Sequence, residues 1–109
     1  MTFNEYQAEA LKTATFTPIG HASTYPAMGL AGEAGEVLDK IKKVWRDGNG
    51  EFTEDKVKAI VDEIGDVMWY CAVLAHTFNV NFEAVADTNI AKLKSRRARN
   101  VIHGSGDNR

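Results

Sequence analysis

The sequence contains little of what marks several common protein classes. Its 109 residues include one cysteine, Cys71, so there is no disulfide framework and no Cys-x-x-Cys pair to hold zinc. Lysine and arginine number 13 against 15 aspartates and glutamates, and this balance offers no basic field for nucleic acid. No segment approaches the roughly 20 apolar residues of a membrane span, and the chain begins without a charged and apolar leader. We therefore expect a soluble, cytoplasmic protein that binds neither nucleic acid nor membranes.

Strand patterns of useful length and internal repeats are also missing, and helical periodicity runs through most of the chain. Pro18 and Pro26 fall in and directly after an expected loop, and the tail has no periodicity. The spacing predicts one all-α domain over residues 1–109, folded as an antiparallel bundle of about four helices. The expected helices cover residues 3–14, 26–46, 54–77 and 82 onward, and the irregular tail covers 103–109. Thr53 and Asn81 are the expected N-terminal caps of the third and fourth helices.

The third helical segment is apolar nearly all round between Val67 and Ala75. Such a helix is buried on more than one side, and a chain this short has few helices of its own to cover it. We expect homo-oligomerisation to complete the bundle, as a homodimer or as a dimer of dimers.

Four carboxylates form two matched pairs, Glu33 and Glu36 in one predicted helix and Glu63 and Asp66 in the next. The members of each pair are three residues apart and share a helix face, so two packed helices would bring all four together. Gathered carboxylates repel one another and lose hydration, and a divalent cation would compensate for both effects. Oxygen ligands without histidine or cysteine favour Mg²⁺, with Mn²⁺ or Ca²⁺ as substitutes, over zinc or copper.

Glycines surround these pairs, with Gly29, Gly32 and Gly35 near the first and Gly65 beside the second. Each costs a helix interior roughly 1 kcal/mol relative to alanine. We therefore expect another helix or a ligand to approach closely at these positions.

A polar stripe follows the fourth predicted helix, where Asn89, Lys92, Arg96 and Arg99 recur at helical spacing. The stripe could hold phosphates, or it could be a solvated face with cations near a helix end, where they are favoured anyway. Lys43, with its basic neighbours at the end of the second helix, has the same two interpretations. Spacing alone leaves both open.

The two pairs, with residues 37–62 between them, resemble the E-x-x-E…E-x-x-D motif of the MazG-like all-α nucleoside triphosphate pyrophosphohydrolases, a group related to the dimeric dUTPases. The likeness extends in order and spacing to residues 29–36, 63–70 and 89–96. The tail resembles that of small, single-domain members of phage or mobile-element type. A single motif set distinguishes the chain from forms with tandem repeats.

The resemblance implies hydrolysis of a (deoxy)nucleoside triphosphate between the α and β phosphates, which yields the monophosphate and pyrophosphate. Glu33, Glu36, Glu63 and Asp66 would bind Mg²⁺, for which Mn²⁺ could substitute. One member of the first pair, Glu33 in preference to Glu36, would also activate the attacking water. A deoxynucleoside triphosphate is the expected substrate, and control of nucleotide pools or housecleaning is the implied role.

The resemblance also assigns the substrate side of the site. Asn89, Lys92 and Arg96 match the positions that hold phosphates in the family. Tyr70 stands one turn after the second acidic pair, where the family often has an aromatic residue near the sugar and base. Trp45 is a second aromatic candidate for stacking on the base.

Two further classes of function stay open on the sequence. One is a catalytically idle module that binds nucleotides in a regulatory role. The other is a structural bundle whose carboxylates lie on its surface. A dUTP-specific enzyme is disfavoured, because the dUTPase branch has extra acidic residues around its first motif, where Gly32 and Ala34 flank Glu33 here.

Overall fold

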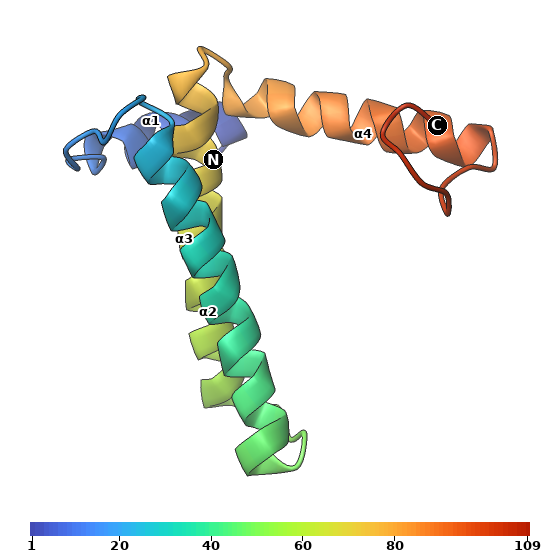
Figure 1. Ribbon diagram of the computed structural model, residues 1–109. Helices are drawn as coiled ribbons and strands as arrows, with labels where there is room; N and C mark the ends of the chain where they lie inside the picture. Colours follow the sequence, from blue (N-terminus) through green and yellow to red (C-terminus); the bar gives the residue numbers. More distant parts are fainter.

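All of residues 1–109 are described by the computed structural model, in which four α-helices make up most of the chain. Their bounds are α1 Phe3–Lys12, α2 Thr24–Gly48, α3 Glu54–Thr77 and α4 Phe82–Ala98. Helices α2 and α3 form a long antiparallel hairpin, α1 crosses one end of it, and α4 leaves it at a steep angle (Figure 1). No sheet forms beyond an isolated bridge between Ile19 and His21. The predicted all-α fold with four helices is confirmed.

Short polar side chains fix where α3 and α4 begin. Thr53 Oγ1 accepts a hydrogen bond from the N–H of Lys56 (3.4 Å), and Asn81 Oδ1 accepts one from the N–H of Ala84 (2.9 Å). Each bond satisfies one of the N–H groups that a helix leaves free in its first turn. Both caps agree with the sequence-based prediction.

Helix α2 begins two residues earlier than the sequence predicted, at Thr24, so Pro26 is its third residue and not its first. Proline is tolerated there because the first four N–H groups of a helix have no intrahelical partner, and proline has no N–H to leave unpaired. The helix ends at Gly48, and the next residue, Asn49, has a left-handed conformation (φ 53°) that starts the turn to α3.

The core is small, with only 9 of the 109 residues buried. It lies where α1 crosses the end of α3 and the beginning of α4. Its buried apolar members are Ala10, Ala72, Val73 and Phe82. The long hairpin of α2 and α3 therefore extends well beyond the part of the chain that has a closed core.

Gln7 is buried in this core and holds the connection between α3 and α4. Its Nε2 donates to the carbonyls of Ala72 (3.0 Å) and Val80 (3.1 Å), and its Oε1 accepts from the N–H of Phe82 (3.1 Å). Through this side chain α1 is tied to both ends of the α3–α4 turn.

Replacing Gln7 with leucine is expected to lower the free energy of unfolding by about 2–4 kcal/mol, because three backbone groups lose their partner at similar side-chain volume. Denaturant titration followed by circular dichroism measures the change. Asn4→Ala is the matched control, since Asn4 bonds to Glu83 from the exposed side of α1 and should cost less than about 1 kcal/mol. Equal losses in the two variants would contradict this assignment.

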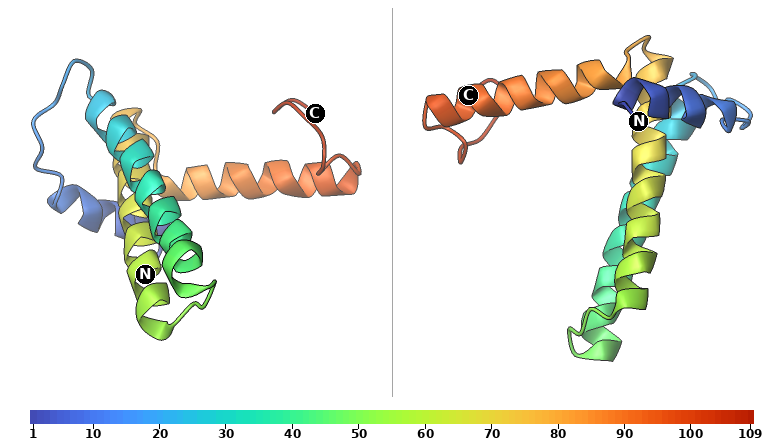
Figure 2. Two further views of the ribbon diagram at one scale, coloured as in Figure 1. Left: turned by 60° about the horizontal axis from the view of Figure 1, so that its bottom comes forward. Right: turned by 180° about the vertical axis from the view of Figure 1, so that it is seen from behind.

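Helix α4 projects away from the hairpin. It contacts α1 and α3 but makes no contact with α2, and the turned views show it extending clear of both long helices (Figure 2). The radius of gyration is 16.8 Å, whereas a compact chain of this length has about 13 Å. A single chain thus forms a helical hairpin with two attached helices, and the predicted antiparallel bundle of four is not closed within it.

No helix has the length and apolar character to cross a membrane.

Large apolar side chains are exposed along one line of α3. The line, named here the α3 stripe, recurs at steps of four, three and four residues. Its members are Val57, Val61, Ile64 and Met68, with exposed fractions of 43, 55, 50 and 36%. Apolar residues at this spacing are typical of a helix face that packs against another helix.

Candidate metal centre

The antiparallel packing of α2 and α3 brings three of the four predicted carboxylates together. Glu33 of α2 and Glu63 and Asp66 of α3 each offer a carboxylate oxygen, and these oxygens lie within 4.8 Å of one another. Glu33 and Glu63 are half-buried, and Asp66 is exposed. Glu36 is exposed on α2, three residues after Glu33, and lies outside this group.

The neighbouring carboxylates of this cluster disfavour the charged form of Glu33. The pKa of Glu33 is raised, first by loss of hydration and then by its hydrogen bond to Glu63 and the negative charges of Asp66, Glu63 and Glu36. A divalent cation among these oxygens would bind the ionised forms and reverse this effect. The donor set contains only carboxylate oxygens, which are the ligands that Mg²⁺ and Mn²⁺ prefer. The residues present therefore fit a hard divalent cation.

Lys40 is a member of this site that the sequence analysis missed. Its Nζ lies 3.3 Å from Glu63 Oε1, so it joins α2 to α3 beside the cluster. The sequence could have predicted this position, because Lys40 is four residues after Glu36 and residues at this spacing share a helix face.

Tyr70 lies one turn beyond Asp66 and packs against α2 at Gly29. A methyl group at Gly29 would overlap the Tyr70 ring, so the glycine makes room for the tyrosine. Burial raises the pKa of Tyr70, with further contributions from Tyr25 and Glu33. Tyr25 stacks on Phe16 with a ring distance of 4.5 Å. Aromatic side chains thus gather on one side of the carboxylates.

The other glycines do not meet the expected close neighbours. A methyl group at Gly32, Gly35 or Gly65 would have no neighbouring atom within 4 Å. Close approach within the chain therefore explains Gly29 alone, and at the other three glycines no neighbouring helix approaches within a single chain. Their open surface is part of the hairpin that α4 leaves uncovered.

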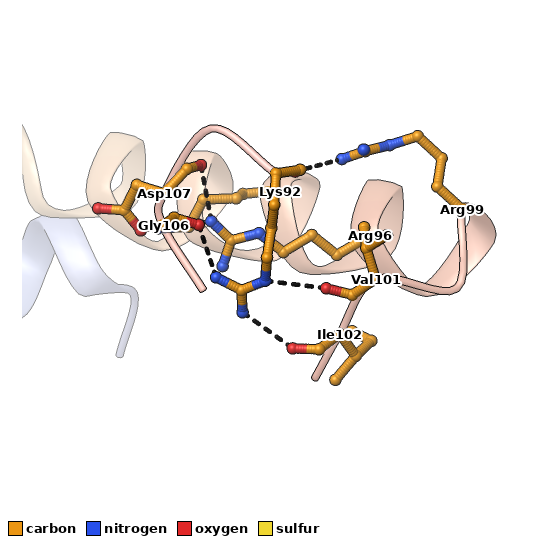
Figure 3. Close-up of polar contacts among 8 residues, drawn as sticks. Lys92, Arg96, Arg99, Val101, Ile102, Gly106 and Asp107 are labelled. Carbon is orange, nitrogen blue, oxygen red and sulfur yellow. Dashed lines mark hydrogen bonds and ion pairs between the residues drawn. The ribbon is translucent and has the colours of Figure 1, made fainter. Parts of the chain in front are cut away.

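The basic residues of α4 are not brought to the carboxylates within one chain. Asn89, Lys92 and Arg96 lie on the helix that makes no contact with α2. Arg96 is only 5% exposed, and its Nη2 donates to the carbonyl of Asp107 (2.7 Å) and to the Asp107 carboxylate (3.3 Å). Lys92 Nζ lies 3.5 Å from the same carboxylate (Figure 3). The tail folds back onto α4 and supplies an anionic partner to both cations.

Lys43 and Trp45 lie further along α2, near the turn to α3. Lys43 forms an ion pair with Asp39 at 2.8 Å. Trp45 is 63% exposed and meets Phe52 edge to face, with the ring centres 6.4 Å apart. It stands about 18 Å along the helix axis from Glu33 and points to the turn, so the structure does not bring it to the carboxylates.

Fold and site together define a class, an all-α protein whose central helical hairpin carries a carboxylate cluster suited to a hard divalent cation. Comparison with known proteins adds the family. The model of the MazG nucleotide pyrophosphohydrolase domain matches residues 21–101, and the chain belongs to this family. The resemblance found in the motifs is thereby confirmed.

A relative from Mycobacterium phage L5, described as "Gene 37 protein", is 44% identical over 109 residues. The match covers 95% of this chain and 96% of the relative. No solved structure matches the chain significantly.

Proposed function

We propose that this chain is a Mg²⁺-dependent pyrophosphohydrolase that cleaves a (deoxy)nucleoside triphosphate between the α and β phosphates. The observation that carries the proposal is the convergence of Glu33, Glu63 and Asp66 from two helices in a chain of this family. Carboxylates this close repel one another unless a cation is shared between them. Membership of the family and an oxygen-only donor set together support a metal-dependent reaction on a nucleotide. Control of the deoxynucleotide pool or housecleaning is the role that such an activity would serve.

Glu33 is the proposed acceptor of the proton from the attacking water. It is the one α2 carboxylate within the cluster, so it faces both α3 carboxylates across the hairpin. Glu36, one turn further along the same helix face, is proposed as a fourth ligand of the cation. The bound Mg²⁺ would lower the pKa of the water and offset the charge that develops on the phosphates.

Tyr70 and Tyr25 are proposed to lie beside the nucleoside. They stand on the aromatic side of the cluster, and aromatic rings provide stacking surface and a hydroxyl for hydrogen bonds.

A second copy of the chain is proposed to complete the site. The α3 stripe is exposed and the four-helix bundle is not closed within one chain, whereas two hairpins packed together supply four helices. We propose that Asn89, Lys92 and Arg96 then meet phosphates at the site of the second copy, because α4 of the same chain does not contact α2. Release of Lys92 and Arg96 from the Asp107 carboxylate would accompany phosphate binding.

The activity is tested by a pyrophosphate-release screen with the eight common ribo- and deoxyribonucleoside triphosphates and modified analogues. We expect Mg²⁺-dependent formation of monophosphate and pyrophosphate in equal amounts and no diphosphate. EDTA should abolish the reaction. Formation of diphosphate and orthophosphate would contradict the proposed cleavage position.

The alternative is a catalytically idle module that binds nucleotides. It predicts that Mg²⁺ and a nucleoside triphosphate raise the melting temperature together, while no pyrophosphate appears in the screen. A chain that responds to neither would support the interpretation as a structural bundle.

A further inference from the structure

A hollow of about 340 Å³ lies between the end of α2 and the beginning of α3, on the side of the carboxylates away from Tyr70. Three lysines and one aspartate provide its charged groups. Its lining consists of Lys40, Lys43, Val44, Asp47, Lys56 and Ala59. This surface, named here the lysine hollow, has no role in the function proposed above.

The lysine hollow is positively charged. Its one carboxylate, Asp47, is already held by two hydrogen bonds from Arg46, each 2.8 Å long. Lys56 has no carboxylate partner, and its Nζ reaches only the carbonyl of Glu51 at 3.4 Å. Lys43 shares the single carboxylate of Asp39 with Lys42. With Glu63 counted as the partner of Lys40, the three lysines still outnumber the two carboxylates, Glu63 and Asp39, that pair with them, which favours an anion in the hollow.

The hollow is continuous with the carboxylate cluster. Lys40 lines the hollow and also lies 3.3 Å from Glu63, so one side chain belongs to both. Along α2 the lysines follow the glutamates, whereas along α3 Lys56 precedes Glu63. Because the two helices are antiparallel, the acidic parts of both helices lie side by side, and so do the basic parts. Lys56 and Glu63 are seven residues apart on one face of α3, about 10 Å along the axis.

We propose that the lysine hollow binds the β and γ phosphates, the pyrophosphate leaving group, of the triphosphate whose α phosphate lies at the carboxylates. This inference rests on the proposed function and gives the site a direction, with the nucleoside toward Tyr70 and the pyrophosphate toward the α2–α3 turn. Lysine ammonium groups on flexible stems suit this task, because they follow phosphate oxygens as point charges. Lys40 would exchange its contact with Glu63 for a phosphate oxygen.

In the reaction, the water oxygen forms a bond to the α phosphorus and its proton passes to the Glu33 carboxylate. The bond between the α phosphorus and the αβ-bridging oxygen breaks, and its electron pair stays on the pyrophosphate. The charge of the leaving group therefore increases where the three lysines stand. Cations at the position where charge develops favour the transition state over the bound substrate.

The test is calorimetric titration of inorganic pyrophosphate, with Mg²⁺ present, into the wild type, Lys56→Gln and Lys58→Gln. Lys56→Gln should weaken pyrophosphate binding about tenfold or more and leave nucleoside monophosphate binding unchanged. Lys58→Gln is the matched control, because Lys58 is exposed on the same helix and pairs with Asp62 outside the hollow. Lys40→Gln should repeat the loss, and circular dichroism checks the fold of each variant.

Unchanged pyrophosphate affinity in Lys56→Gln and Lys40→Gln would overturn the inference, and so would an equal loss in Lys58→Gln. These measurements need no turnover, so they separate this inference from the proposed function. A protein that binds pyrophosphate through these lysines but hydrolyses no triphosphate would disprove the proposed activity and support the lysine hollow as a pyrophosphate site. An active enzyme whose pyrophosphate affinity does not change when these lysines are replaced would disprove only the assignment of the hollow as the pyrophosphate site.

Discussion

Replacing Asp66 with asparagine is expected to reduce pyrophosphate release by about a thousandfold or more. Asparagine keeps the shape of the side chain but removes one of the three converging charges that would hold the cation. The lost ligand weakens Mg²⁺ binding, and the remaining cation is positioned less well against the phosphates. Steady-state assays at saturating Mg²⁺ measure the effect.

The same substitution should make the metal-free protein more stable. Asp66 contributes to the repulsion that raises the pKa of Glu33, so removing its charge relieves the folded state. Added Mg²⁺ should raise the melting temperature of the wild type and not that of Asp66→Asn. A gain in metal-free stability together with a loss of activity is the result expected of a binding site and not of a structural ion pair.

Asp62→Asn is the control for both measurements. Asp62 lies one turn before Asp66 on α3, is exposed, and pairs with Lys58 instead of joining the cluster. It should keep wild-type activity and the response to Mg²⁺. If Asp66→Asn also keeps both, the cluster is not the metal site, and the proposed function loses the observation on which it rests.

Glu36→Gln tests the carboxylate that stands outside the cluster. Its charge already contributes to the raised pKa of Glu33, and it lies on the same face of α2. Loss of activity in this variant would assign Glu36 to the cation as a fourth ligand. Full activity would limit the site to the three carboxylates that converge in the structure.

Local patterns in the sequence predicted the helices and the approach of three of the four carboxylates, while Glu36 lies outside the cluster. The caps at Thr53 and Asn81 depend on one side chain and one nearby N–H, and both are found in the structure. The carboxylates meet because residues three apart share a helix face and an apolar face brings the two helices together. These features need only short-range geometry and one packed pair of helices.

The direction of α4 and the lysine hollow were not predicted, because both depend on contacts between distant parts of the chain. Gln7 bonds to the α3–α4 turn from 65 to 75 residues away, and no periodicity contains such a contact. The hollow needs Lys40 of one helix opposite Lys56 of the next, which follows only once the register of the hairpin is known. A helical pattern shows which face is apolar, but it does not show what covers that face.

The α3 stripe provides the second large effect, because Ile64→Glu is expected to separate the proposed dimer into monomers. Two-fold symmetry places the same residue twice in an interface, so one substitution introduces two charges into it. Buried charges without partners are strongly unfavourable, and the dissociation constant should rise by about a hundredfold or more. Sedimentation velocity at micromolar concentration measures the change, with the wild type expected as a dimer or a dimer of dimers.

Activity should fall together with the dimer, since Ile64 stands between Glu63 and Asp66 on α3 and the proposed phosphate contacts come from the second copy. Ile19→Glu is the matched control, because Ile19 is 54% exposed in the loop before α2 and lies off the stripe. It should leave both the dimer and the activity intact. A wild type that sediments as a monomer, or an Ile64→Glu variant that stays dimeric, would show that the second copy does not pack against this face of α3.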